Sequence, residues 1–549
     1  MTVQAPPRAH ARTRPGGWVG ALTSTDHKRI ALNLALCSLT FFLIGGLMAL
    51  LIRAQISQPD NHIVSDQTYT ELFTMHGSTM IYLFVTPMAI ALGMYLVPLQ
   101  IGAHSIAGGR AALAGFWTWL FGGLIMQSGW LTAGGSGRDG WFSYVPLSES
   151  PYTPGVGQDL WTLGVILAVA GMFIMAACVL ATIARRRAPG MALLRMPPFT
   201  WTALVAVLMV VGSFPVLILA MVMLYVDRTT TAHIYSGFNG IIDYQDLFWF
   251  FGHPVVYVMF FPYLGCATEA IATCAHKRWF GYKAFVASML AFAALSMSVW
   301  AHHMFITGGS FNEFFAFTST LLIVPAGIEY FDMAGTLIGG SLVMRTSMWF
   351  GLMFFVQFLI GGLSGIFVAS PVLDYAANDT YFVIAHFHYT LFAGSIFGFF
   401  AGVYHWYPKV TGVFLRERLG KVQLVLMIIG TNMTFFPMFI VGEEGMPRRI
   451  SRYPQHPAWG TANLIESIGA GIIALGVLVF LYNVWLSLRQ RQPAGPDPWQ
   501  GHSLEWWTTS PPPPLNFEAP LPPIRSYAPL QDLREQAEDR APEREPASA

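Results

Sequence analysis

The sequence predicts an all-α membrane protein with about twelve transmembrane helices and both termini in the cytoplasm. Hydrophobic residues make up 54% of the 549 residues, charged residues only 11%, and the mean hydropathy is +0.51, which excludes an ordinary soluble enzyme. Apolar runs of roughly 20 residues, the length that a helix needs to cross the hydrocarbon core, recur along the chain. Such runs are too long for barrel strands, and lipid satisfies no backbone polar group, so only helices remain.

The apolar runs are joined by short connections and define three regions. An N-terminal cytoplasmic segment over residues 1–25 has no signal-peptide run, a twelve-helix domain covers 26–490, and a Pro-rich cytoplasmic tail covers 491–549. The prolines and charged end of the tail predict an extended, passive segment. The expected spans are residues 30–53, 75–98, 111–133, 159–183, 201–226, 244–272, 283–306, 314–342, 346–369, 380–405, 421–441 and 463–488.

Lysine and arginine gather in the connections that follow even-numbered spans, and the positive-inside bias therefore places these connections and both termini on the cytoplasmic side. One cluster departs from this pattern. Arg448, Arg449 and Arg452 follow the eleventh span on the predicted outer side, so they need a local anionic partner. The cations of the even-numbered connections are Arg185, Arg186, Arg187, Arg195, Lys277, Arg278, Lys283, Lys409, Arg416, Arg418 and Lys421.

Six histidines lie inside the apolar stretches, where an imidazole is costly unless a metal or a hydrogen bond satisfies it. His386 and His388 are two apart on a predicted helix. Each residue advances about 100°, so they face nearly opposite sides and can hold two separate ligands. Haem iron takes axial histidine, and His76 is the free candidate for a second axial position. The alternative for any one of them alone is a core histidine bonded to the backbone.

The other three histidines have a different spacing. His302 and His303 are adjacent and His253 lies on another span, which brings together three imidazoles without a nearby cysteine or carboxylate. All-nitrogen ligation suits copper, zinc or iron. Tyr257 follows His253 by four residues and shares its helix face, where a phenol can supply an electron and a proton. Tyr257 favours redox copper, although a packing tyrosine fits the spacing equally well.

Five motifs resemble subunit I of the haem-copper oxidases, in particular the aa3-like cytochrome c oxidase branch. The resemblance extends from DHKRI at 26–30 through PWQGHSLEWWTTSPPPP at 498–514. An all-α fold of about twelve spans is what it implies. The motifs are FTMHG at 73–77, FWFFGHPVVY at 248–257, WAHHMF at 300–305, DTYFVIAHFHY at 379–389 and GMPRR at 445–449.

The resemblance implies two haems and one copper, CuB, with Tyr257 cross-linked to His253 as the catalytic pair. The implied ligands are His76 and His388 for the low-spin haem iron, His386 for the high-spin haem iron, and His253, His302 and His303 for copper. Arg448, Arg449 and Trp141 match residues that contact haem propionates, which would be the anions of the outer cluster. Arg53 matches the residue that contacts the formyl group of haem A, so haem A is expected.

The reaction implied by the resemblance is four-electron reduction of dioxygen to water by a multi-pass protein of a bacterial cell membrane. Iron and copper supply electrons, and Tyr257 supplies a further electron and proton. The implied partners are a subunit II with dinuclear copper, subunit III and other oxidase subunits. The implied electron donor is cytochrome c or a similar carrier.

Proton delivery departs from the family pattern. The usual D-type route needs an acidic entrance, an asparagine and a glutamate after the His-Pro, but this chain has Ser105, Met94 and Val255 there. A variant with Tyr-Ser before the His-Pro is excluded, because Phe251 and Gly252 occupy those positions. Pumping is therefore in doubt.

The K-type route normally uses a lysine and a threonine on the eighth span, where this chain has Glu329 and Ala326. Thr320 and Thr268 remain as polar groups. An apolar environment disfavours a charged carboxylate, and a neutral acid can donate and accept protons. We expect Glu329 to serve a remodelled route for chemical protons. The alternative is an acid neutralised by a lysine or arginine of a neighbouring helix or subunit.

A magnesium or manganese site is the third departure. The family usually has a histidine at position 378 that shares the ion with the following aspartate and with subunit II. Here Asn378 precedes Asp379, and a carboxylate with an amide oxygen still suits a hard cation. We keep this site as a hypothesis.

Three other functions compete with this interpretation. Nitric oxide reductases use a similar scaffold but lack the tyrosine and use a carboxylate for non-haem iron, so Tyr257 and Val255 favour an oxidase. A non-catalytic haem sensor is disfavoured by the complete ligand set. A quinol-oxidising member would have a histidine and a glutamine where Thr68 and Glu71 occur, which favours cytochrome c.

Overall fold

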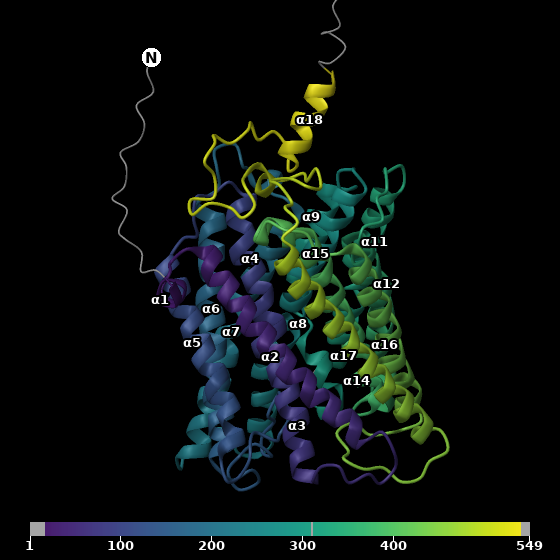
Figure 1. Ribbon diagram of the computed structural model, residues 1–549. Helices are drawn as coiled ribbons and strands as arrows, with labels where there is room; N and C mark the ends of the chain where they lie inside the picture. The colour runs from purple at the N-terminus through teal and green to yellow at the C-terminus, as the bar shows by residue number, and fades with distance from the viewer. Residues whose placement is uncertain (1–16, 309–310, 540–549) are drawn as a thin grey trace, which may run out of the picture.

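The computed structural model describes residues 17–308 and 311–539, and in that part of the chain it forms a bundle of long helices without a β-sheet (Figure 1). The all-α prediction is confirmed. Eleven helical segments among these residues are long and apolar enough to cross a membrane. Residues 1–16 of the expected N-terminal segment and residues 540–549 of the expected tail lie outside the described residues.

The first half of the bundle contains α1 to α8, of which α8 (Gly237–Cys274), with 38 residues, is the longest. Side-chain caps start two of them, since Asp26 accepts a hydrogen bond from the Lys28 amide and Ser65 from the Thr68 amide. The elements are α1 (Gly17–Leu22), α2 (His27–Gln55), α3 (Asp66–Ser78), the π-helical η1 (Thr79–Val85), α4 (Thr86–Gln100), α5 (Gly109–Ser128), η2 (Gly129–Leu131), α6 (Val156–Arg185), η3 (Leu193–Arg195), α7 (Pro198–Thr229) and α8 (Gly237–Cys274).

The second half contains shorter and interrupted helices. Its elements are α9 (Tyr282–Ser296), the 3₁₀-helical η4 (Trp300–Thr307), α10 (Asn312–Thr320), α11 (Ile323–Leu337), α12 (Thr346–Val368), α13 (Pro371–Ala377), α14 (Tyr381–Phe387), the π-helical η5 (His388–Ala393), α15 (Gly394–Thr411), α16 (Glu417–Glu443), α17 (Trp459–Gln490), η6 (Leu504–Trp507) and α18 (Pro529–Asp539). The interruptions at η4 and η5 fall at four of the six buried histidines or next to them.

Eleven of the twelve expected spans correspond to the candidate membrane helices, and the twelfth, 111–133, corresponds to α5. The expected span 111–133 forms a helix, but its glycines and tryptophans lower its hydropathy and it ends at Ser128. Those glycines allow close packing on α6, because a Cβ on Gly122 would lie only 2.4 Å from the Ala168 nitrogen. Small residues at such crossings are typical of membrane helix pairs.

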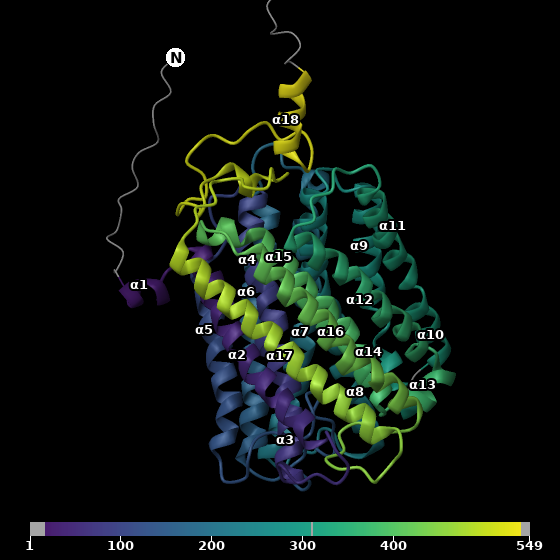
Figure 2. The same ribbon diagram turned by 45° about the vertical axis from the view of Figure 1, so that its right-hand side comes forward.

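The segment after α17 folds back over the helix ends instead of extending into solvent (Figures 1 and 2). Trp499, Leu504 and Trp506 are buried there. Asn516 anchors the segment, since its Nδ2 donates to the Ala103 carbonyl at 2.7 Å and its Oδ1 accepts from Lys28 Nζ at 2.8 Å. The described part of the tail is therefore a packed cap, which corrects the expectation of a passive, extended segment.

The two ends of the bundle differ in what they carry. We call the end with the cap and the start of α2 the tail end, and the opposite end, with Arg448 and Arg449, the arginine end. Cations expected on the cytoplasmic side contact the cap, as Arg278 does at Asp532 (2.7 Å) and Lys409 at the Thr508 carbonyl (2.7 Å). The start of α2 and the cap thus share one end.

Candidate metal centres

Three imidazoles converge between α8 and η4. His253 Nδ1 lies 3.3 Å from His303 Nε2, and His302 Nε2 lies 3.1 Å from the same atom. One nitrogen from each ring lies within 4.8 Å of the other two, and no other group of three or more histidine, cysteine or acidic residues in the described ranges meets this criterion. Three clustered nitrogens without a carboxylate form a donor set for copper, zinc or iron.

The surroundings hold the three rings in place. His302 Nδ1 contacts Ser319 Oγ at 2.6 Å, so its Nε2 is left for a ligand. Trp249 stacks on His303 with ring centroids 3.9 Å apart and planes 16° apart. The Tyr257 ring lies 4.9 Å from the His253 ring. The four-residue spacing on α8 therefore brings the phenol to the metal site.

The remaining three histidines share one hydrogen-bond pattern. In each, Nδ1 contacts a backbone carbonyl: His76 that of Gly45 at 2.9 Å, His386 that of Gly361 at 3.2 Å, and His388 that of Ile384 at 2.8 Å. A carbonyl accepts a proton from Nδ1 and so selects the tautomer whose Nε2 lone pair is free. All three rings are therefore prepared to bind iron through Nε2.

His386 and His388 point to different helices. His386 Nδ1 also contacts Ser364 Oγ at 3.1 Å on α12, whereas His388 stacks on Phe435 of α16 with centroids 4.3 Å apart. A Cβ on Gly365 would lie 3.1 Å from His386 Cε1, so a glycine on α12 lets this ring fit closely. The helix from which both histidines come widens into π geometry at His388, a feature frequent at functional sites.

The arginine end of the bundle contains a half-buried cation, Arg449, that lies over aromatic rings. Arg449 lies over the Phe142 ring at 4.3 Å, and no carboxylate among the described residues forms an ion pair with it. Burial lowers the pKa of Arg449 to about 9. Arg449 has a positive φ of 66°, a conformation that costs energy outside glycine. A strained, half-buried guanidinium fits an anionic group of a cofactor.

Trp141, the aromatic residue expected beside the cofactor's anionic groups, lies at the same end of the bundle as Arg449. Trp141 packs on Phe248 with ring centroids 5.1 Å apart. Its Cβ lies 3.3 Å from the position that a Cβ added to Gly77, the residue after His76, would take. Arg448 is bound differently from Arg449, because its Nε donates to Asp379 Oδ1 at 2.6 Å. Trp141 and Arg449 therefore flank the His76 region, while Arg448 is paired within the chain.

Arg53 lies at the arginine end of α2. Its Nη2 donates to the Asn463 carbonyl at 2.7 Å, and its Nη1 lies 2.9 Å from Glu466 Oε2. Its Nε is buried and has no hydrogen-bond acceptor among the described residues. That donor fits a carbonyl-type oxygen of a cofactor.

A search of protein families matches residues 29–472 to cytochrome c and quinol oxidase polypeptide I. The chain belongs to this family. Cytochrome c oxidase subunit 1 of Corynebacterium diphtheriae is 44% identical over 499 residues, 90% of this chain and 88% of that protein. The putative cytochrome c oxidase subunit 1-beta of Streptomyces coelicolor is 43% identical over 522 residues, 94% of this chain and 91% of the relative.

The fold has a solved counterpart. A haem-copper terminal oxidase dimer, determined by electron cryo-microscopy, matches with a TM-score of 0.70 at 19% identity, covering 85% of this chain and 84% of that one. Membership of the oxidase polypeptide I family makes the chain a membrane-embedded oxidoreductase subunit with haem and copper. The expected resemblance and the enzyme class are thus confirmed.

The polar residues expected on the proton route are less well connected in this oxidase. Thr268 Oγ1 donates to the Leu264 carbonyl at 2.8 Å and Thr320 Oγ1 to the Ala316 carbonyl at 2.9 Å, so both hydroxyls bond to their own helices. Ser105 accepts from Arg186 at 3.0 Å. Of the other two replaced D-route positions, Met94 and Val255 are buried apolar side chains.

Glu329 is the exception. Its Oε1 accepts a hydrogen bond from Ser288 on α9, and its Oε2 is buried without a partner among the described residues. No lysine or arginine of the described ranges forms an ion pair with it. Neutralisation by a cation of this chain, one of the two interpretations of Glu329, is therefore not observed.

Several contacts of the oxidase site have no signal in a single sequence. Ser319 and Ser364 support metal ligands, Ser288 supports Glu329, and Glu466 pairs with Arg53. Serines are common in membrane helices, so only the helix packing distinguishes these. Glu466 could have been noticed as an acid inside an apolar span.

Proposed function

We propose that this chain is the catalytic subunit of a terminal oxidase that reduces dioxygen to water with electrons from cytochrome c. The observation that carries the proposal is the convergence of His253, His302 and His303 with Tyr257 against the same core that holds His386. The relatives named cytochrome c oxidase subunit 1 support this donor, although the family model includes quinol oxidases as well.

The residues present fit two haems and one copper. His76 and His388 would hold a low-spin haem through Nε2 and His386 a high-spin haem, while the three clustered imidazoles would hold copper. Haem iron and copper, when bound, would supply electrons to dioxygen. The chain's own part is to keep each imidazole in the ligating tautomer, to exclude water with Trp249 and to hold a transferable proton on Tyr257.

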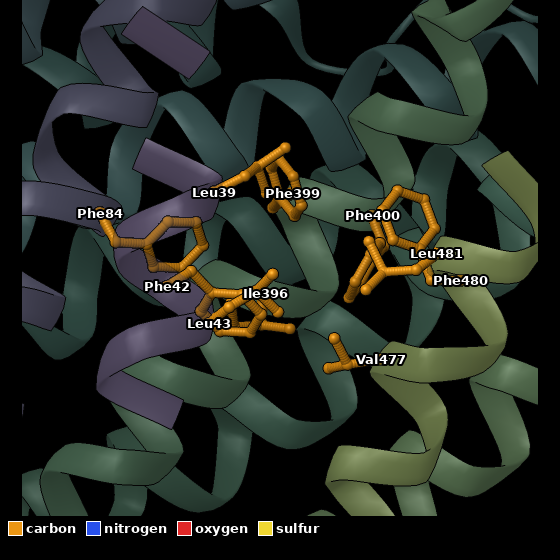
Figure 3. Close-up of a pocket in the computed structure, with 10 residues that line it drawn as sticks. All are labelled: Leu39, Phe42, Leu43, Phe84, Ile396, Phe399, Phe400, Val477, Phe480 and Leu481. Atoms are coloured by element: carbon orange, nitrogen blue, oxygen red, sulfur yellow. The ribbon is translucent and has the colours of Figure 1, made fainter. Parts of the chain in front are cut away.

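A haem with a long apolar tail is favoured at the low-spin site. An apolar cavity lies between α2, η1, α15 and α17 (Figure 3). Its lining residues on η1 and α15 follow His76 and His388 by about two to three helical turns toward the tail end. Only apolar side chains line it: Leu39, Phe42, Leu43, Phe84, Ile396, Phe399, Phe400, Val477, Phe480 and Leu481. This cavity and the free Arg53 Nε–H support haem A with its formyl group at Arg53.

Chemical protons would reach the site through Glu329. A small cavity beside this acid is lined by Phe260, Leu264 and Phe292. Phe292 also contacts Tyr257, with ring centroids 5.7 Å apart, so one wall residue of the cavity lies between the acid and the phenol. Thr320 and Thr268, which bond to their own helices, would have at most a secondary role on the proposed route.

Replacing Glu329 tests this route. Glu329→Gln keeps the acceptor for Ser288 but removes the transferable proton, so we expect oxygen turnover to fall by on the order of 10²-fold, the scale of losing a positioned proton donor. Glu313→Gln, an exposed acid of α10, is the matched control and should leave turnover unchanged. Unchanged turnover in Glu329→Gln would refute the proton-carrier role.

Other subunits have room to bind. The apolar windows of the α10–α11 segment and of α12 are only 28% buried within this chain, so lipid or partner subunits must cover them. A subunit II with dinuclear copper, subunit III and a cytochrome c donor are the partners we propose. The proposed location is a bacterial plasma membrane.

We do not extend the proposal to a magnesium or manganese ion at Asn378 and Asp379. Asp379 is paired with Arg448, and the Asn378 amide donates to Asp374 Oδ2 at 3.2 Å, so their side chains already have other partners.

Purification of the intact complex tests the function as a whole. We expect two haems and one copper per chain, oxygen uptake with reduced cytochrome c, and high-spin haem that binds carbon monoxide and cyanide. Nitric oxide reduction with non-haem iron in place of copper, or a haem that binds neither ligand, would contradict the proposal. Uptake with quinol alone would change only the donor.

A further inference from the structure

Glu466 is a fully buried acid on α17 whose one ionic partner in the described chain is Arg53 on α2. Arg53 Nη1 lies 2.9 Å from Glu466 Oε2, and the side chains are 7% and 0% exposed. Neither carboxylate oxygen has a hydrogen-bond partner with good geometry among the described residues. The acid therefore interacts with Arg53 mainly through its charge.

The neighbouring polar groups hold Arg53 but do not offset its charge. Arg53 Nη2 donates to the Asn463 carbonyl, and Ser467 Oγ donates to the Arg53 carbonyl at 2.8 Å. The titratable groups that face the pair are the phenols of Tyr69, Tyr381 and Tyr453. Glu466 is thus the one carboxylate that neutralises Arg53.

The pair lies beside the proposed low-spin haem site. Gly45, whose carbonyl contacts His76 Nδ1, is eight residues before Arg53 on α2, about 12 Å along a helix that rises 1.5 Å per residue. Arg53 Nε–H is the free donor that we assign to the formyl group of this haem. This placement rests on the proposed function.

We propose that Glu466 sets the reduction potential of the low-spin haem by neutralising Arg53. A guanidinium that donates to the formyl oxygen withdraws electron density from the macrocycle and favours the reduced form. A carboxylate on the other side of the same guanidinium weakens this effect. Charges interact strongly in a medium of low dielectric constant, and salt does not screen a buried pair.

Stability alone does not account for the pair. Burying two charges costs desolvation energy that their attraction often fails to recover, so a buried ion pair is a poor stabilising device compared with apolar packing. The Arg53–Glu466 pair lies beside the free Nε–H of Arg53, and this arrangement fits a role in adjusting the charge near the haem.

The experiment is a redox titration of the purified holoenzyme with Glu466→Gln. At a fixed ambient potential we expect the ratio of reduced to oxidised low-spin haem to rise by about tenfold, which is 59 mV for a one-electron couple. Resonance Raman spectra should show a lower formyl stretching frequency, because Arg53 donates a stronger hydrogen bond once its charge is uncompensated. A merely structural contact would change neither quantity.

Two further variants keep the test decisive. Glu466→Asp retains the charge but withdraws it by one methylene, so both readouts should move in the same direction by less. Asp159→Asn, which breaks another carboxylate–arginine pair at the arginine end (Arg228 Nε to Asp159 Oδ1, 2.7 Å), should move neither. If Glu466→Gln does not assemble, Glu466→Asp alone decides.

The outcomes separate this inference from the proposed function. A wild-type holoenzyme without a six-coordinate low-spin haem would contradict the proposed function itself. A normal low-spin haem whose potential and formyl frequency are the same in wild type and the Glu466 variants would overturn the role of Glu466 only. An equal shift in Asp159→Asn would also overturn it, because the effect would then be nonspecific.

Discussion

The metal-ligand histidines and the polar residues of the expected proton route both lie on membrane-spanning segments, but their side chains have different partners. Four of the six histidines have Nδ1 in contact with a backbone carbonyl or, for His302, with a serine hydroxyl, which leaves Nε2 to bind metal. His303 lies under Trp249, and His253 Nδ1 faces His303 Nε2 in the cluster. The hydroxyls of Thr268 and Thr320 bond instead to their own helices. The comparison teaches that the helix packing supports the metal ligands, whereas the proposed proton route would depend on a single acid, Glu329.

The largest expected effect comes from breaking the copper site. His302→Ala removes one of three nitrogens and leaves Ser319 without its partner. We expect copper to fall from one per chain to near zero and oxygen turnover to vanish, while low-spin haem remains. Metal analysis and optical spectra measure this, and retained copper would contradict the assignment.

A smaller effect is expected from the support of a haem ligand. Ser364→Ala removes the hydroxyl 3.1 Å from His386 Nδ1 but leaves the Gly361 carbonyl contact. Loss of such a support typically costs 10- to 100-fold in metal affinity or activity, and we expect about the lower figure. Turnover and high-spin haem content report it. Wild-type values for both would show that Ser364 only packs.

The tail end gives a smaller effect again, on stability rather than on chemistry. Asn516→Ala would remove the Oδ1 acceptor that contacts His27 and Lys28 and the amide donor to the Ala103 carbonyl, although Lys28 keeps its contact with the Pro514 carbonyl at 3.1 Å. A buried group left unsatisfied costs about 1–3 kcal/mol, so the Tm should fall while metal content stays normal. An unchanged Tm would mean that the cap does not support the bundle.

The smallest effect is expected at Thr320. Its hydroxyl is exposed at the bundle surface and bonds to its own helix, so Thr320→Val should leave turnover unchanged. If oxygen turnover in Thr320→Val fell as far as in Glu329→Gln, the proton route would have to run along the outer face of α10. Thr320 would then matter as much as Glu329.

Much of the fold follows from the sequence, because lipid demands long apolar helices. The expected span 111–133 is helical as α5, and its glycines pack on α6. The tail was misjudged because proline content was weighed above Trp499, Trp506 and Asn516, which bury against the helix ends.

The metal ligands could be expected from the sequence because an imidazole in hydrocarbon is costly unless a metal or a hydrogen bond satisfies it, and six of them recur in apolar spans. Their supports could not, since Ser319, Ser364 and Gly365 come from other helices and depend on how the bundle packs. Glu466 needed the structure too. Its spacing on α17 does not reveal that Arg53, 413 positions earlier, lies 2.9 Å away.

We propose, as the central claim, that a complete metal region operates with a rebuilt proton route and that proton pumping is weakened or lost. Oxygen pulses to proteoliposomes of the intact complex, with valinomycin present and cytochrome c outside, test it most directly. We predict oxygen consumption with alkalinisation of the interior and no acidification outside. Outside acidification that a protonophore abolishes would contradict the account.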